Sequence, residues 1–343
     1  MKIKELLTST KLAAFATAAT LLLAPQSSRA QWTKEVSVPS ALGAIMSPPV
    51  SVRRSVAFAV NHPTYQQVVV TTRNGAVTST SIPATVSEKN KGPAVTDIAD
   101  GPGGIWFTQF HLDKVGRASR SGNVVKYALP ENSRPTGLTE GPKHDMFVVL
   151  QGSDSIARLK RGVVVAEYSV PTPDSGLVHI ASGAGPSRDN LFFTEWRAGQ
   201  IGILNAKTNT ISEYALPAGL HTPTDITVDP KTGNAWFRVE GDAQIAMITP
   251  TGNITGFVIS PEGYSASGIA VTRDGAVCAP VPEAHVIACM QRDGSPLADI
   301  RIPSDGCLSG VAAFKGPQHS RRPDIAVIEN CAARVGLAPV PTP

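Results

Sequence analysis

The chain repeats a short strand-like segment that ends in proline, and this repeat constrains its fold more than any other feature. Seven such prolines follow one another at intervals of 41 to 47 residues: Pro39, Pro83, Pro130, Pro171, Pro217, Pro261 and Pro303. A period in this range is typical of β-propellers, in which each repeat forms one blade. We therefore expect an all-β chain whose repeats surround a central axis.

Each unit contains four short apolar segments separated by turn residues, as a four-stranded blade requires. One unit shows them most plainly, at residues 96–99, 105–108, 114–117 and 124–129. The middle two segments recur at 191–195 with 200–203, and at 235–237 with 244–247. Beyond residue 30, no stretch keeps a helical period for long enough to favour helices instead.

The two ends of the chain complement each other. The last unit, from about residue 308 to residue 340, has three strand-like segments and lacks a fourth. The segment from Trp32 to Val38 resembles that missing outer strand, and its pairing with the last blade would remove exposed sheet edges. We predict a seven-bladed β-propeller closed by this N-terminal strand. Six blades are the alternative, because the segment from Ser55 to Pro83 matches the repeat poorly.

Residues 1–30 have the features of a secretory signal peptide rather than of a blade. Basic residues precede an apolar run from Leu12 to Ala24, and Ser28-Arg29-Ala30 offers small residues for cleavage before Gln31. The apolar run is too short to span a bilayer, although a retained membrane anchor is the alternative. We predict that residues 31–343 form one propeller domain, a monomer that is secreted or extracytoplasmic.

The charge of the chain argues against a nucleic-acid partner. Without residues 1–30, the 31 basic and 27 acidic residues fall to 27 and 26, a net charge of about +1. No basic stripe interleaved with aromatic residues is present in the sequence, as nucleic-acid binding would require. We expect a small-molecule substrate or ligand instead, with no membrane partner after cleavage of the signal peptide.

All four cysteines lie in the last two units, at positions 278, 289, 307 and 331. In the blade model, Cys278 and Cys289 flank one hairpin turn, while Cys307 and Cys331 lie at the open ends of another hairpin. This favours two disulfides, 278–289 and 307–331, among the three possible pairings. Four buried free thiols are the alternative, and a zinc site is disfavoured because the sequence has no Cys-x-x-Cys pair.

The repeated segment resembles a known family. Residues 101–109 read Gly-Pro-Gly-Gly-Ile-Trp-Phe-Thr-Gln and are followed by Lys-Val-Gly-Arg at 114–117; Asn-Leu-Phe-Phe-Thr-Glu at 190–195 and Gln-Ile-Gly at 200–202 repeat the pattern. These motifs are similar to those of the streptogramin B lyases, also called virginiamycin B lyases, which are seven-bladed propellers. The resemblance covers about Asp97 to Met247 well and is more specific for the repeat than for the chemistry.

The resemblance implies a magnesium-assisted elimination that opens a cyclic depsipeptide without water. In that family acidic residues hold the metal, and a histidine two positions before the inner-strand Ile acts as the base. The matching positions here lack histidine and hold Thr96, Thr136, Val178, Thr224, Ser267 and Ser309, and no residue two positions earlier is acidic. Hydroxyls are not bases near neutral pH without help, so the mechanism does not carry over intact and magnesium has no assigned ligands.

Other polar positions suggest a site at the mouth where the inner strands begin. The last position of the second strand returns to that level in an antiparallel sheet, and it holds Glu195, Glu329, Gln109 and Gln151. We expect the glutamates to act as acid or base, or alternatively to accept N–H bonds between blades. We expect the two glutamines and five hydroxyls to orient the substrate, the hydroxyls being those of Thr96, Thr136, Thr224, Ser267 and Ser309.

A histidine and a tyrosine in loops complete the candidate catalytic set. His221 precedes Thr224 and can reach the mouth freely, and Tyr264 lies in a loop that leads into a blade. His179 lies one residue after the family's histidine position, so by strand alternation it faces the other side unless a β-bulge re-aims it. We therefore expect His179 to be a hydrogen-bonded residue between blades.

Two functions are favoured by this sequence, with a purely structural or surface-interaction role as a third. The resemblance favours a lyase- or isomerase-type enzyme that acts on a cyclic or polycyclic small molecule in the central funnel. The alternative is a propeller that binds a small molecule, glycan or peptide without catalysis, because a fold does not by itself confer an activity.

Overall fold

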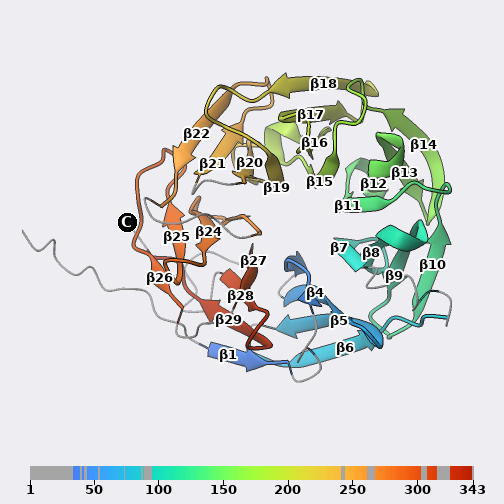
Figure 1. Cartoon of the computed structure of the whole chain (residues 1–343), viewed down its shortest axis with the longest axis horizontal. Coiled ribbons are helices and arrows are strands. Elements are labelled where there is room, and N and C mark those ends of the chain that lie inside the picture. Colours follow the sequence, from blue (N-terminus) through green and yellow to red (C-terminus); the bar gives the residue numbers. More distant parts are fainter. Residues whose placement is uncertain are drawn as a thin grey trace, which may run out of the picture.

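The computed structural model is a ring of seven β-sheets around a central axis (Figure 1). It describes residues 34–38, 41, 45–52, 55–72, 74–85, 88, 95–240, 244–260, 267–302, 307–314 and 325–341. The predicted signal peptide lies outside these residues. Within the described residues, no helix has the length and apolar character needed to cross a membrane. The prediction of an all-β propeller with seven blades is confirmed, and six blades are excluded.

The first four blades are antiparallel sheets built from consecutive segments of the chain. Blade 1 contains β2 (Ile45–Met46), β3 (Val50–Val52), β4 (Ser55–His62), β5 (Tyr65–Thr72) and β6 (Val77–Ser81). Blade 2 contains β7 (Val95–Gly101), β8 (Gly104–Gln109), β9 (Lys114–Ala118) and β10 (Val124–Ala128). Blade 3 contains β11 (Pro135–Glu140), β12 (Met146–Leu150), β13 (Ser155–Lys160) and β14 (Val163–Ser169). Blade 4 contains β15 (Leu177–Ser182), β16 (Asn190–Glu195), β17 (Gln200–Asn205) and β18 (Thr210–Ala215).

The last three blades complete the ring. Blade 5 contains β19 (Pro223–Val228), β20 (Ala235–Val239), β21 (Gln244–Ile248) and β22 (Ile254–Val258). Blade 6 contains β23 (Ala270–Val271), β24 (Val277–Val281), β25 (Val286–Met290) and β26 (Ile300–Arg301). Blade 7 contains β27 (Leu308–Ala313), β28 (Ile325–Glu329), β29 (Arg334–Ala338) and, from the other end of the chain, β1 (Lys34–Ser37).

The burial of each strand follows from its place in the ring. The second strands β12, β20, β24 and β28 are buried at every residue, because each blade is packed between two others. The outer strand β14 instead alternates exposed and half-buried residues along its whole length. The strongly apolar middle segments of the sequence repeat are therefore the core of each blade.

The phenylalanine and glycine of the repeat are a packing pair. Phe107 of β8 lies opposite Gly116 of β9, and Phe193 of β16 lies opposite Gly202 of β17. A Cβ atom at either glycine would overlap the phenylalanine ring across from it. Both rings are fully buried, so the glycine makes room for a ring that has nowhere else to go. This explains the Ile-Gly or Val-Gly that follows each Phe-Thr in these two units.

The N-terminal strand closes the ring, as predicted. β1 pairs antiparallel with β29 along its whole length, with Val36 opposite Val335. Glu35 forms an ion pair with Arg334 at 2.6 Å, and the Val38 N–H donates to the Ala333 carbonyl. Trp32, with which the predicted strand begins, lies outside the described residues.

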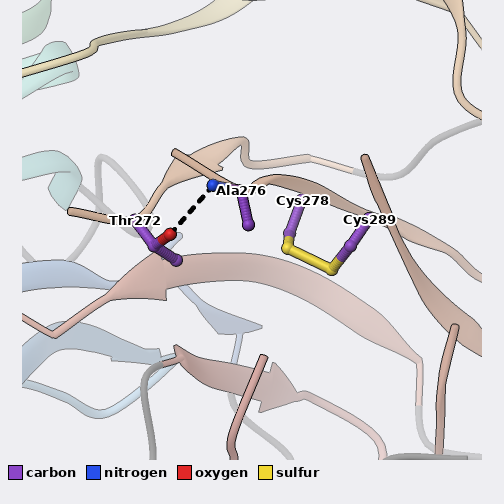
Figure 2. The surroundings of a disulfide bond; sticks show 4 residues. All are labelled: Thr272, Ala276, Cys278 and Cys289. Atoms are coloured by element: carbon purple, nitrogen blue, oxygen red, sulfur yellow. Dashed lines mark hydrogen bonds between the residues drawn. A yellow bond between two sulfur atoms is a disulfide. The ribbon is translucent and has the colours of Figure 1, made fainter. Parts of the chain in front are cut away.

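Both predicted disulfides are present in blades 6 and 7. Cys278 and Cys289 are directly opposite each other on β24 and β25, with 4.2 Å between their Cα atoms (Figure 2). Cys307 and Cys331 are bridged with a Cα–Cα distance of 5.1 Å. Each bridge therefore holds a hairpin in one of the two blades next to the point of closure.

A β-bulge interrupts the pairing of the first and second strands in five blades. In each of these blades the pairing register shifts between two residues of the first strand: Val95 and Ile98, Pro135 and Leu138, Leu177 and Ile180, Pro223 and Ile226, or Leu308 and Gly310. In blades 2 and 4 a threonine of the second strand supports the bulge, because Thr108 accepts the Asp97 N–H at 3.0 Å and Thr194 accepts the His179 N–H at 3.1 Å. A bulge turns the side chains beside it, so these positions no longer follow simple alternation.

Candidate functional site

A cavity of about 680 Å³ lies on the axis of the ring, among the inner strands. Its lining comes from β7, β11, β15, β19, β23 and β27, and from the prolines between β2 and β3. This volume is within the range of small-molecule sites, which is about 300–1,000 Å³. The cavity is therefore large enough for a ligand of the size of a drug molecule.

The bulge residues define one end of the cavity. In β7, β15 and β19 the first lining residues are Asp97, His179 and Asp225, and the lining then continues toward the C-terminal end of each strand. Blades 6 and 7 contribute an apolar wall that includes residues 269–271 and 311–314. The cavity thus combines a polar end with a long apolar side.

His179 lies between two carboxylates at this polar end. Its Nδ1 atom is 3.2 Å from Oδ1 of Asp225, and its Nε2 atom is 3.9 Å from Oδ1 of Asp97. The three side chains keep 20%, 10% and 14% of their surface exposed, respectively, so a molecule in the cavity can reach them. The bulge in β15 turns His179 toward the axis, and its contact with Asp225 of blade 5 is the polar contact between blades that we expected.

Asp225 is held in its ionised form. Burial opposes its charge, but His179 and Arg238 on either side outweigh that effect and lower the pKa of Asp225. The Arg238 Nε–H donates to Oδ2 at 3.2 Å, and the Gly268 N–H donates to the same oxygen at 2.9 Å. Arg238 occupies the position that threonine has in blades 2 and 4, so this departure from the repeat provides the counter-ion.

Asp97 has a different environment. The Ile98 N–H donates to its Oδ1 at 2.8 Å and the Leu138 N–H donates to its Oδ2 at 3.0 Å, but no guanidinium contacts it in the described residues. Burial raises the pKa of Asp97, His179 and the two N–H bonds oppose this, and the charge of Asp225 adds to the rise. The two carboxyl groups beside His179 therefore differ, because Asp97 keeps its proton to a higher pH than Asp225.

The arrangement has the parts of an acid–base site. An ionised Asp225 next to Nδ1 favours the imidazole tautomer that carries its proton on that nitrogen. His179 lines the cavity and its Nε2 atom lies 3.9 Å from Oδ1 of Asp97, so the imidazole is placed to exchange a proton with a bound molecule. This proton transfer needs no residue from the opposite end of the cavity.

The five predicted hydroxyl residues are not among the described residues that line the cavity. Thr96 bonds to the Thr108 hydroxyl at 2.8 Å and to the Pro135 carbonyl of the next blade at 3.2 Å, and Thr136 donates to the Leu177 carbonyl at 3.4 Å. The hydroxyls of Thr224 and Ser309 are buried without a partner in the described chain, and Ser267 is exposed. Their role in substrate binding stays a prediction.

The predicted glutamates and glutamines lie outside the cavity lining as well. Glu195 and Glu329 are both fully buried. Burial and the nearby Glu213 carboxylate raise the pKa of Glu195 to about 8, so this group is mainly neutral at pH 7. Gln151 donates to the Leu177 carbonyl at 2.8 Å, and Gln109 donates to the Gln66 side chain at 3.4 Å. The two glutamines are thus held by contacts within and between the blades.

Of the two loop residues in the predicted catalytic set, one is described, and it does not line the cavity. His221 is exposed and is not part of the cavity lining. Tyr264 lies outside the described residues. Sequence reasoning missed Asp97 and Asp225, although a signal existed: an ionisable residue directly precedes the inner-strand Ile at positions 97, 179 and 225.

The residues of the polar end do not fit a magnesium ion. Within the described chain, no group of three or more His, Cys, Asp or Glu side chains is arranged to hold a metal. The carboxylate oxygens of Asp97 and Asp225 already accept N–H bonds or face His179, whereas magnesium takes oxygen ligands in octahedral geometry. We therefore assign no residue to magnesium and describe no step that uses it.

Comparison with known proteins identifies relatives by sequence. The model of the virginiamycin B lyase family matches residues 40–290. A virginiamycin B lyase from Nocardia farcinica (strain IFM 10152) is 28% identical over 130 residues, which are 38% of this chain and 44% of that protein. The chain thus matches less than half the length of this curated relative.

Solved structures with the same fold include two lyases. A catalytically inactive variant of virginiamycin B lyase from Staphylococcus aureus, with quinupristin, superposes with a TM-score of 0.75 at 22% identity, covering 90% of this chain and 98% of that one. A streptogramin B lyase structure gives a TM-score of 0.73 at 23% identity, covering 90% and 97%. At these identities the likeness shows the fold and not the chemistry.

Proposed function

The chain belongs to the virginiamycin B lyase family, and from this membership we propose that it is a lyase- or isomerase-type enzyme. Its substrate is a cyclic or polycyclic small molecule bound in the central cavity, and His179 is the base. The proposal is supported by one observation above all: His179 lines the cavity with one nitrogen held by Asp225 and the other 3.9 Å from Asp97.

The chemistry follows from this orientation. Nε2 of His179 takes a proton from a carbon next to a carbonyl group, and the resulting imidazolium is stabilised by Asp225. Arg238 keeps Asp225 ionised before the substrate arrives, so the base is ready in the resting enzyme. The apolar residues of blades 6 and 7 contact the carbon skeleton of the substrate.

The first test is a search for turnover with a panel of cyclic depsipeptides and lactones, beginning with quinupristin, the compound that accompanies the S. aureus lyase variant. Isomerisation, or an elimination that opens the ring, leaves the mass of the compound unchanged and alters its chromatographic retention time. Hydrolysis adds the mass of one water. We expect a product of unchanged mass. We also expect EDTA to leave the rate unchanged, because no metal ligands are assigned.

The variant His179→Ala tests the proposed base. Removal of a general base typically slows a reaction by about 10²–10⁴-fold, and we expect a loss of that size. His111→Ala is the matched control, since His111 is an exposed histidine on a short 3-10 turn outside the cavity lining. Equal activity of the His179→Ala and His111→Ala proteins would contradict the assignment of His179.

Binding without catalysis is the second candidate function. It is favoured by the absence of histidine at all six positions where the sequence motif of the family would place one. In that case a ligand that binds in the cavity would raise the melting temperature of the protein without being converted. Thermal shift measurements on the same panel, with mass analysis afterwards, separate the two functions.

We also propose that the protein acts outside the cytosol. Its two disulfides support this location, because such bonds persist in oxidising compartments. Fractionation of the native host, followed by mass analysis of the N-terminus, tests it. The expected mature protein begins at Gln31, and a cytosolic protein with reduced cysteines would contradict the proposal.

A further inference from the structure

We propose that Asp97 is a second catalytic residue, which donates a proton to a leaving oxygen that would otherwise depart from the substrate as an alkoxide. This inference rests on the proposed function, in which His179 is the base. It narrows the substrate class to molecules with a hydroxyl or ether oxygen β to a carbonyl group.

The geometry separates the two carboxyl groups by role. Asp225 is within 3.2 Å of the His179 ring and holds it, whereas Asp97 is 3.9 Å from the other nitrogen. A distance of 3.9 Å exceeds that of a normal hydrogen bond, so Asp97 does not simply hold the ring from the second side. Asp97 and His179 both line the same end of the cavity, where a bound molecule can contact both.

The charges around the cluster assign opposite roles to the same two groups. Asp225 faces His179 and Arg238, and its charge is thereby stabilised. Asp97 faces His179 and two backbone N–H groups, with Asp225 as a like charge nearby, and burial raises its pKa. The environment of Asp225 thus suits a carboxylate that holds His179, and the environment of Asp97 suits a carboxyl group that donates a proton.

The reaction balances with these groups alone. Nε2 of His179 takes the proton from the α-carbon, the electrons of that C–H bond form a double bond, and the bond between the β-carbon and its oxygen breaks. The oxygen leaves with the bonding electron pair and takes the proton of Asp97. The products are an unsaturated carbonyl compound and an alcohol, or water. The imidazolium then returns its proton to the Asp97 carboxylate, which lies on the same side of the ring.

The need for a proton donor is what specifies the leaving group. A carboxylate that leaves from an ester is stable as an anion and departs without a proton. An alkoxide or hydroxide is a strong base, so its departure is slow unless an acid protonates it as the bond breaks. A base paired with an acid on the same cavity wall is therefore suited to β-hydroxy and β-alkoxy carbonyl compounds. Both proton transfers then take place on the same side of the bond between the α- and β-carbons.

The first experiment needs no substrate. Wild-type protein is labelled with ¹³C at the aspartate carboxyl carbon, which leaves the buried Glu195 silent, and the Asp97 and Asp225 signals are assigned by their loss in Asp97→Asn and Asp225→Asn proteins. We expect the Asp97 signal to have the shift of a protonated acid at a pH where Asp225 has that of a carboxylate. An Asp97 that is ionised at the assay pH overturns the proposal, whatever the activity of the protein.

The second experiment compares two probes with one carbon skeleton, β-methoxycyclohexanone and β-acetoxycyclohexanone. We expect Asp97→Asn to slow loss of methanol by about 100-fold or more and loss of acetate by less than about 5-fold. Asp274→Asn, which replaces an exposed aspartate outside the cavity lining, is the control. Equal losses with both probes would mean that Asp97 only positions His179, and this outcome overturns the proposal.

The two experiments also separate this inference from the proposed function. If the wild-type protein converts neither probe and no member of the depsipeptide panel, the proposed function fails. If it converts the acetate with dependence on His179 but never the ether, the base is supported and the alkoxide leaving group is rejected.

Discussion

Glu195 shows how much a single buried carboxyl group influences this fold. It has no exposed surface, and its carboxyl group lies beside Ser175 and Glu213. Its pKa is raised from 4.5 to about 8, chiefly by burial and also by Glu213. The folded protein therefore binds a proton that the unfolded chain releases above pH 4.5, and stability from this group decreases as the pH rises toward 8.

The variant Glu195→Gln tests this linkage. Glutamine has nearly the same shape and no charge, so the unfolding free energy of the variant should lose the pH dependence that Glu195 causes. We expect the wild type to lose on the order of a few kcal/mol between pH 5 and pH 8 relative to the variant, measured by urea unfolding at several pH values. Glu131→Gln, at an exposed glutamate, is the control. Parallel curves for wild type and Glu195→Gln would show that Glu195 is ionised at pH 7.

Packing between neighbouring strands depends on the glycine opposite each buried phenylalanine. Gly202 of β17 has an ordinary backbone conformation, so an alanine there is strained only by the Phe193 ring. We expect Gly202→Ala to cost about 1–3 kcal/mol, the usual range for overpacking, and Gly202→Ala with Phe193→Leu to recover part of the loss. Chemical unfolding measures both. Gly256→Ala in β22 meets only the end of the Leu220 side chain and should be nearly neutral.

The strands also explain where sequence reasoning succeeded and where it did not. The seven blades, the closing strand and both disulfide pairings could be predicted, because each follows from the regular spacing of the sequence repeats. The cavity residues could not be assigned by alternation, because the bulge at Leu177/Ile180 changes which side chain faces the axis. The threonine after each phenylalanine was the clue, since Thr194 accepts the N–H of the bulge residue His179.

At the scale of the whole molecule, the position of the site depends on the ring. Asp97, His179 and Asp225 come from blades 2, 4 and 5, and they meet only because the inner strands surround one axis. Figure 1 shows that β1 completes the blade formed by the C-terminal strands. A single four-residue strand thus joins the two ends of the chain and keeps the blades in one ring around the cavity.

This closure can be tested with one substitution in β1. Val36 is 6% exposed and packs in a cluster that includes Val335 and Leu337, so Val36→Asp would bury a charge without a partner. We expect a loss of several kcal/mol in one cooperative transition, together with weaker binding of any cavity ligand, because an open ring exposes the edge of β29 and loosens every blade. Glu35→Gln removes only the partly exposed ion pair to Arg334 and should cost less than about 1 kcal/mol. Differential scanning calorimetry distinguishes the two outcomes: if Val36→Asp melted blade 7 alone, in a separate early transition with the cavity intact, the blades would be independent units and the ring would not depend on its closing strand.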